Sequence, residues 1–218
     1  MLSRAEIAGP FILILLLASP GIAQQRPQPF SVAKGFPEPP ESTSFEFSSG
    51  GFQYKIAENG KGRRSGNDKQ LAFSLRVAPN DYLTHQLYYA DYEGDLLLIG
   101  EVSDSDYGMG FIARLDGATL RLKWKRVINA FNVGQGLLDG AYAYVTGIGF
   151  VGKVNLKSGA YAWRHDDLYR RDGAFNSFEL PDVEGNVVVF REAPQYLRKK
   201  KAVIRIKRQS GKIVSINT

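Results

Sequence analysis

The cluster of side chains best suited to acid–base or metal chemistry is His165-Asp166-Asp167. A histidine beside carboxylates can serve as a general base with an orienting partner, or as part of a metal site. The other histidine, His85, is far away in the sequence, and no third ligand is evident. Because a metal site needs several converging ligands, the sequence favours a solvated loop at this position.

Two further patterns that could carry chemistry are incomplete. Asp104-Ser105-Asp106 offers alternating carboxylates like those of calcium loops, but the bidentate Glu that closes such a loop is missing. Ser-His-Asp catalysis has no Gly-x-Ser-x-Gly nucleophile elbow to support it. The chain has no cysteine, which excludes disulfides, thiolate metal sites and a cysteine nucleophile. We therefore predict no catalytic residue, no metal and no cofactor.

Two basic clusters are the candidates for a binding site. They could meet an anionic partner, with an affinity that falls as the salt concentration rises. The alternative is that they are solvated hairpin tips whose lysines prevent edge-to-edge pairing of strands. The residues concerned are Arg63 and Arg64, beside Lys61, and the run Arg198, Lys199, Lys200 and Lys201.

The N-terminus is built like a secretory signal peptide. One basic residue, Arg4, precedes the apolar run 11–18, and small residues lead to Ala23. This order predicts export, with cleavage after Ala23 and a signal peptide at 1–23. The apolar run is too short to span a bilayer, which needs about 20 apolar residues. A retained N-terminal anchor is the alternative. The formal net charge of +6 favours association with anionic surfaces.

After the signal peptide, the chain divides into a leader and one larger domain. Residues 24–44 are rich in proline, which disfavours helices and paired strands, so we expect an extended leader or linker. The domain at 45–218 opens with period-2 alternation of apolar and polar residues, which is typical of half-buried strands. This alternation covers 45–47, 52–56 and 71–77, and a polar loop is expected at 59–70.

A unit of four strands recurs three times, at about 85–130, 131–172 and 173–218. In each unit an acidic residue and a glycine precede a β-rich run, which marks a tight hairpin. These pairs are Glu93-Gly94, Asp139-Gly140 and Glu184-Gly185. First strands are expected at 86–89, 135–138 and 177–180, and closing strands carry Trp124, Trp163 and Ser215 at equivalent places. Such repeats predict an all-β fold with antiparallel four-stranded blades of a short or partial β-propeller.

The closing part of the repeat resembles that of quinoprotein (pyrroloquinoline-quinone)-type β-propellers, in the non-enzymatic branch. The motif is Leu-Asp-x-x-Thr-Gly-x-x-x-Trp, and 115–124 keeps its Asp, Thr and Trp. Residues 154–163 keep the Gly and Trp, whereas 206–215 have lost the Asp and the Trp. The resemblance implies that Trp124 and Trp163 pack between neighbouring sheets.

The resemblance also bears on cofactors. The dehydrogenases of that family stack their quinone between a tryptophan and a disulfide of adjacent cysteines, and they hold a calcium ion. This chain has no cysteine to form the disulfide, so no quinone is expected.

The sequence therefore favours an exported module, periplasmic or secreted, that binds a protein or an anionic envelope component without catalysis. Nucleic acid is not an expected partner. Three copies leave strand edges and apolar faces open. Strands from 45–77 could supply a partial blade, a homodimer could complete the propeller, or an open fragment could cap its own ends; of the last two, the sequence favours the homodimer. The alternative function is a hydrolase or lyase with a carboxylate site in the central funnel, built from residues such as Asp116 or Asp166.

Overall fold

The computed structural model describes residues 26–38, 42–66, 69–103, 108–170, 173–194 and 201–218. The described residues form an all-β fold of antiparallel sheets, as the alternating sequence pattern predicts. The predicted signal peptide at 1–23 lies outside the described residues. Within the described residues, no helix is long and apolar enough to cross a membrane.

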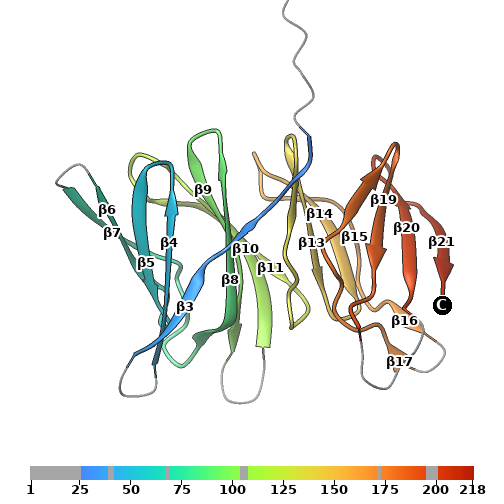
Figure 1. The fold of residues 1–218 in the computed structure, drawn as a ribbon, viewed down its shortest axis with the longest axis horizontal. Helices are drawn as coiled ribbons and strands as arrows, with labels where there is room; N and C mark the ends of the chain where they lie inside the picture. The colour runs from blue at the N-terminus through green and yellow to red at the C-terminus, as the bar shows by residue number, and fades with distance from the viewer. Residues whose placement is uncertain (1–25, 39–41, 67–68, 104–107, 171–172, 195–200) are drawn as a thin grey trace, which may run out of the picture.

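Four antiparallel sheets lie side by side in chain order and form the blades of a partial propeller (Figure 1). Blade 1 contains β4 (Ser42–Ser49), β5 (Phe52–Ala57), β6 (Lys61–Gly66) and β7 (Lys69–Ser74). Blade 2 contains β8 (Tyr82–Tyr92), β9 (Asp95–Ser103), β10 (Gly108–Leu115) and β11 (Leu122–Ile128). Blade 3 contains β12 (Leu137–Asp139), β13 (Tyr142–Gly147), β14 (Phe150–Asn155) and β15 (Tyr161–His165). Blade 4 contains β18 (Asp182–Glu184), β19 (Val187–Arg191), β20 (Val203–Lys207) and β21 (Ile213–Asn217), and the short hairpin β16 (Tyr169–Arg170) and β17 (Gly173–Ala174) precedes it.

The core consists of three apolar layers, one between each pair of successive blades. Blades 1 and 2 bury Phe45, Ile56 and Leu98 against each other. Leu97 lies beside Leu98 in β9, yet it belongs to the layer between blades 2 and 3. Successive side chains of a strand point to opposite faces, so each central blade contributes to two layers. The third layer joins blades 3 and 4 around Tyr144 and contains Trp163, Phe190 and Ile204.

The acidic-Gly pairs form the expected tight turns. Gly94, Gly140 and Gly185 have φ angles of +77°, +57° and +60°. Glycine adopts this left-handed conformation without the steric cost that a side chain adds. The turns connect β8 to β9, β12 to β13 and β18 to β19, as the repeat predicted.

The segment Gln28–Glu38, which we call the strap, crosses three blades (Figure 1). Its strands are β1 (Gln28–Pro29), β2 (Ser31–Val32) and β3 (Lys34–Glu38), and they pair with β12, β8 and β4. The expectation that 24–44 contains no paired strand is therefore wrong. Pro29 and Pro37 are tolerated because β1 and β3 are edge strands, where a missing N–H need not face a neighbour.

Two other expectations about local structure are also wrong. The polar loop expected at 59–70 contains β6 and the start of β7, so blade 1 is a complete blade. Its polar sequence fits because one face of blade 1 packs against no further sheet of the described chain. The first strand of blade 4 is Asp182–Glu184 and not 177–180, where Phe178 makes an isolated bridge to Glu192.

Candidate binding surfaces

The two tryptophans join successive blades, as the resemblance implied. The indole N–H of Trp124 in blade 2 donates to the backbone oxygen of Leu156 in blade 3, at 3.1 Å. In the same way Trp163 in blade 3 donates to the oxygen of Arg208 in blade 4, at 3.0 Å. Each accepting residue lies in the turn between the third and fourth strands of its blade. Both indoles are therefore packing residues with a satisfied donor.

A cation from the third strand shares each of these acceptors. Arg114 Nη1 donates to Leu156 O at 2.9 Å, and Lys153 Nζ donates to Arg208 O at 2.9 Å. Both cations stand directly opposite their blade's tryptophan, beside a β-bulge in the ladder. A bulge bends the strand and re-aims its side chain. Burial lowers the pKa of the Lys153 ammonium below its ordinary value. Cation and indole together form a repeated link between blades.

Glycine provides the room that each indole needs. A Cβ atom built on Gly211 would lie 2.5 Å from Trp163 Cγ, and one on Gly159 would lie 2.6 Å from Trp124 Cδ2. Both glycines also have positive φ angles, of +72° and +69°. Contacts this short force a neighbour to move. The turn therefore requires glycine both for its positive φ angle and for the space that the indole occupies.

We expect Gly211→Ala to lower the free energy of unfolding more than Gly140→Ala does. Gly140 also has a positive φ, of +57°, but a Cβ there meets nothing within 4 Å. Gly140→Ala should therefore cost only the backbone term, about 1 kcal/mol. Gly211→Ala adds the collision with Trp163 and should cost roughly 2–3 kcal/mol. Urea unfolding of both variants measures the difference, and equal costs would contradict the packing role.

Two buried glutamates fasten the segments that enter blades 3 and 4. Glu101 is 8% exposed and accepts the backbone N–H groups of Asn132 and Val133, with Thr84 Oγ1 at 3.3 Å from its other oxygen. Glu192 is 2% exposed and accepts the N–H groups of Asn176 and Ala202. A polar cavity of about 120 Å³ adjoins Glu101. Each carboxylate satisfies backbone donors that burial would otherwise leave unpaired, so we assign both to structure.

Asp116 and Asp166, the carboxylates named for a catalytic site, lie in different blades and have separate partners. Asp116 accepts the backbone N–H groups of Ala118 and Thr119 in its own turn, and lies 3.0 Å from Lys123 Nζ. These hydrogen bonds hold the pKa of its carboxyl well below the ordinary value. Asp166 follows β15 in another blade and pairs with Arg164 at 2.9 Å. Asp104, of the calcium-loop-like pattern, lies outside the described residues.

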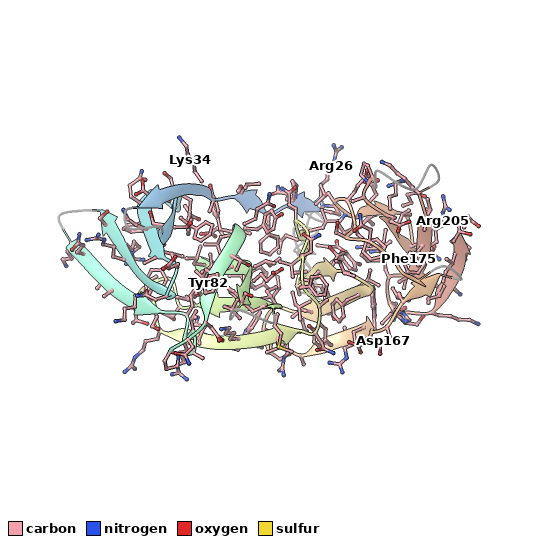
Figure 2. The ribbon with its side chains drawn as sticks, turned by 90° about the horizontal axis from the view of Figure 1, so that it is seen from below. Arg26, Lys34, Tyr82, Asp167, Phe175 and Arg205 are labelled. Carbon is pink, nitrogen blue, oxygen red and sulfur yellow. The ribbon has the colours of Figure 1, made fainter. Side chains whose placement is uncertain are left out.

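The cluster around His165 is also placed by contacts between blades. The ring Nε2 of His165 lies 2.7 Å from Gly211 O in blade 4. Figure 2 shows Asp167 on the opposite side of the row of sheets from the strap, where Lys34 of the strap and Arg26, just before it, are labelled. The described residues contain no group of three or more His, Cys, Asp or Glu side chains that could hold a metal ion.

The alternative hydrolase or lyase needs a central funnel lined by the first strand of each blade. In blades 1 to 3 the strap covers the edges of these strands. The inner strands β4, β8 and β12 are not open edges, because the strap pairs with each of them. The strap is also held by its neighbours: Phe30 N donates to Gly136 O at 2.9 Å, and Ala33 N to Leu87 O at 2.8 Å. Neither observation favours a catalytic site.

Of the predicted anion-binding residues, Arg64 is already engaged in the fold. Its guanidinium donates to the backbone oxygens of Gly117 and Ala118 in blade 2, and lies 4.1 Å over the ring of Phe52. Gly117 occupies the turn position that Leu156 and Arg208 hold in the later blades. Arg64 is therefore the cation of the first link between blades.

Arg63 points the other way and lines an open hollow of about 300 Å³ on blade 1. Arg63 pairs with Lys55 across β5 and β6, and the flanking residues Tyr54 and Ile56 face blade 2. Lys55 and Arg63 therefore share the opposite face of blade 1. Lys61 and Asn59 also line the hollow, and Glu46 lies 3.3 Å from Lys55 Nζ. We call this surface the blade 1 hollow.

The second predicted basic cluster is only partly described. Arg198, Lys199 and Lys200 lie outside the described residues. Lys201 precedes β20 and its Nζ lies 2.5 Å from Glu179 Oε1. The structure therefore brings together Lys55, Lys61 and Arg63, and it does not bring Lys201 to them.

Sequence reasoning missed the cations of the links between blades. Arg114 precedes Trp124 by ten positions, and Lys153 precedes Trp163 by ten. This constant spacing was a usable signal, because residues opposite each other in a hairpin keep a fixed separation when the turn length is fixed. Lys55 was missed as well, since nothing in the sequence showed that β5 and β6 pair.

Comparisons with known proteins add little to this description. No protein-family model matches the chain, and no curated protein matches it. Among solved structures, the chain is similar to BamB from Moraxella catarrhalis, with a TM-score of 0.41 and 12% sequence identity. The match covers 78% of this chain and 61% of that chain, so this chain spans less than two thirds of that protein's length. The description of the blades rests on the strand pairings of this chain itself.

Proposed function

We propose that the protein is an exported, non-catalytic binding module, periplasmic or secreted, that holds an acidic partner protein at the blade 1 hollow. The observation that carries the proposal is the convergence of Lys55, Lys61 and Arg63 on one hollow. Cations gathered in a concave site attract carboxylates more strongly than the same cations scattered over a surface. The rigid blades behind the hollow hold it in place.

The lining favours a protein over a membrane surface. Besides the three cations, the lining contains Ala57, Asn59 and Gly62. None of these offers a large apolar side chain that could enter the acyl region of a bilayer, which peripheral membrane binding ordinarily uses. Asn59 Oδ1 accepts the backbone N–H of Lys61 at 3.0 Å, and the amide NH₂ of the same side chain adds donors to the lining.

We expect labelled poly-glutamate to bind the protein and the double variant Lys61→Glu, Arg63→Glu to weaken that binding by at least about tenfold. The matched control is Lys157→Glu, Lys212→Glu, which reverses two exposed lysines in turns of blades 3 and 4 and changes the net charge equally. Fluorescence anisotropy at low and high salt measures the affinity. The affinity should fall as salt rises, because screening weakens exposed charge pairs.

Two results would overturn this proposal. If the control variant lowers the affinity as much as the hollow variant, net charge and not the hollow is responsible. If vesicles of anionic phospholipid bind and poly-glutamate does not, the partner is a lipid surface and not an acidic protein.

We further propose that the module works as an open array of blades. A head-to-tail pair closing a ring, as the homodimer prediction requires, would bring blade 4 against the blade 1 hollow. Arg205 and Lys207 lie on that side of blade 4, and within the described residues they have no acidic partner. Like charges facing each other are unfavourable, so light scattering should give the molar mass of one chain.

A further inference from the structure

Glu101 differs from the other buried acids of the described chain in how its two oxygens are used. Asp95 and Asp139 each pair with an arginine. Glu192 accepts one backbone N–H on each of its oxygens, both at 3.0 Å. Glu101 instead accepts both of its backbone N–H groups on Oε2. Among the described contacts, its Oε1 is left with one long hydrogen bond, from Thr84 Oγ1 at 3.3 Å.

The charge of Glu101 has no counter-ion in the described structure. Glu101 is 8% exposed, and within the side chains that the structure describes no lysine, arginine or histidine pairs with it. A buried carboxylate is costly unless a cation pairs with it and its lone pairs are satisfied. A cation supplied from outside the chain would meet both needs, because Oε1 can accept a further hydrogen bond.

An open polar pocket gives access to this carboxylate. The pocket has a volume of about 120 Å³ and is lined by Thr84, Gln86, Glu101, Asn132 and Val133. We call it the Glu101 pocket. Figure 2 labels Tyr82, which begins β8 two residues before Thr84. Between Thr84 and Tyr88 the pairing of β8 with β9 is irregular, and such irregularities often adjoin binding sites. A cavity of this size holds a few water molecules or the end of one extended side chain.

Gly108 keeps space open beside Glu101 Oε1. A Cβ atom built on Gly108 would lie 3.0 Å from that oxygen and 3.6 Å from Phe131 Cβ. Gly108 is not among the glycines with a positive φ angle, so the backbone does not require glycine here. Phe131 is 53% exposed and directly precedes Asn132 of the lining. A carboxylate oxygen and an exposed aromatic residue therefore flank the same small space.

We propose that the Glu101 pocket binds a primary ammonium group on an alkyl stem, which is the end of a lysine side chain or of a free polyamine. An ammonium has three hydrogen-bond donors and no acceptor. Glu101 Oε1, Thr84 Oγ1 and the amide oxygen of Asn132 are acceptors of the lining. Phe131 supplies an aromatic surface for the cation or for the methylene groups behind it. The site lies in blades 2 and 3 and does not rest on the blade 1 hollow.

A guanidinium or a metal ion fits the pocket less well. A guanidinium binds a carboxylate best through two parallel hydrogen bonds, but Oε2 of Glu101 already accepts the N–H groups of Asn132 and Val133. Calcium takes about six to eight oxygen ligands, carboxylates prominent among them. No group of three or more His, Cys, Asp or Glu side chains suited to a metal occurs in the described part of the chain. One free carboxylate oxygen suits a singly charged donor.

Titration of the ¹⁵N-labelled protein with Nα-acetyl-lysine amide tests the proposal. The backbone N–H groups of Asn132 and Val133 report binding, because both donate to the same carboxylate. Their resonances should shift with the lysine amide, and Nα-acetyl-arginine amide should bind at least about tenfold more weakly. Glu101→Gln should weaken binding of the lysine amide at least about tenfold, because it keeps the shape and removes the charge. The control Glu93→Gln removes the same charge from a 66% exposed side chain of blade 2 and should leave the affinity unchanged.

A second variant fills the pocket and keeps the carboxylate. Gly108→Ala should also weaken binding, because its Cβ occupies the space beside Glu101 Oε1. The matched control is Gly35→Ala, whose Cβ would meet nothing closer than 3.7 Å, and it should bind like the natural protein. Thermal unfolding shows which variants are folded. The comparison of the lysine and arginine amides uses the natural chain alone, so it needs no variant to fold.

Two further ligands identify the source of the ammonium. An acetylated glycine peptide with one central lysine presents the side chain as a protein would, and spermidine presents it as a free polyamine. Tighter binding of the peptide assigns the pocket to a lysine of a partner protein. Tighter binding of spermidine assigns it to a polyamine. Either result supports an ammonium site.

The proposal fails if no amine shifts the two reporter resonances, or if the arginine amide binds as tightly as the lysine amide. It fails equally if folded Glu101→Gln or folded Gly108→Ala keeps the natural affinity. A shift caused by calcium and not by the lysine amide would make the pocket a metal site. None of these outcomes changes poly-glutamate binding at the blade 1 hollow, so the two proposals fail separately.

Discussion

Phe30→Ala should lower the free energy of unfolding by about 3–5 kcal/mol, the range for removing a buried phenylalanine. Phe30 is fully buried in the layer between blades 2 and 3, although it belongs to the strap. Gln135 Nε2 donates to the backbone oxygen of Phe30, and the backbone N–H of Phe30 donates to Gly136 O. The truncated side chain would leave a cavity at the place where the strap is anchored, so urea unfolding should show the loss directly.

The matched control lies two residues away. Val32 belongs to the same strap but is 55% exposed, so Val32→Ala should change stability by less than about 0.5 kcal/mol. If Phe30→Ala proves as mild as Val32→Ala, the strap is a loosely held segment and not part of the core. Limited proteolysis gives a second readout, because a released strap exposes its backbone at 28–38.

Asp95→Ala should cost about 3–5 kcal/mol, because it removes the closer acid from a buried guanidinium and leaves it only the exposed Glu93, at 3.4 Å. Asp95 Oδ2 lies 2.5 Å from Arg114 Nε and 2.7 Å from Lys123 Nζ, and its other oxygen accepts the N–H of Gly117. The side chains of Asp95 and Arg114 are 7% and 9% exposed. Asp95 thus orients the cation that links blade 2 to blade 3.

A double variant tests this explanation. Asp95→Ala leaves the Arg114 cation buried without its closer acid, and Arg114→Met removes that cation. The two changes together should therefore cost less than the sum of the separate costs. Simple addition of the two costs would mean that Asp95 and Arg114 act independently. Asp116→Ala should cost less than Asp95→Ala, because the Asp116 side chain, in the turn between β10 and β11, is more exposed.

The stability of the protein should depend on the ionisation of Asp95 at acidic pH. Burial alone would raise the pKa of Asp95, but hydrogen bonds from Lys123, Gly117 and Arg114 lower it below the ordinary value. A lowered folded-state pKa adds stability above the unfolded-state pKa, and that stability is lost as pH falls through the folded value. The protein should therefore weaken below about pH 4, and Asp95→Asn should flatten that part of the curve of stability against pH.

The sequence predicted the repeating part of the fold well. Alternation and acidic-Gly turns placed the second, third and fourth strands of three blades, because these signals are local. Trp124 and Trp163 were recognisable as packing residues for the same reason: each recurs at a fixed place in a repeat. Local patterns are predictable when each strand pairs with its neighbour in the chain.

Features that depend on distant pairing were not predictable. Pro29 and Pro37 argue against a paired strand until it is known that the strap lies at sheet edges. Blade 1 was read as partial because β6 has the composition of a loop, Lys-Gly-Arg-Arg-Ser-Gly, and its partners become visible only in the register. Arg64 was predicted to be an exposed binding residue for the same reason.

The candidate binding site was predictable only in part. Arg63 was chosen for its charge, and the structure keeps it on an open surface. Lys55 joins Arg63 through cross-strand pairing and not through sequence proximity.

The strap imposes an order on how the chain can fold as it is made. Phe30 is synthesised early, yet the amide that holds its backbone oxygen, from Gln135, lies 105 residues later. During that interval the strap can already pair with β8 and β4, but Gln135, which holds the strap in place, has not yet been synthesised. Closing so long a loop is slow, and open strand edges invite wrong pairing meanwhile. Refolding should therefore end with strap docking as its slow phase.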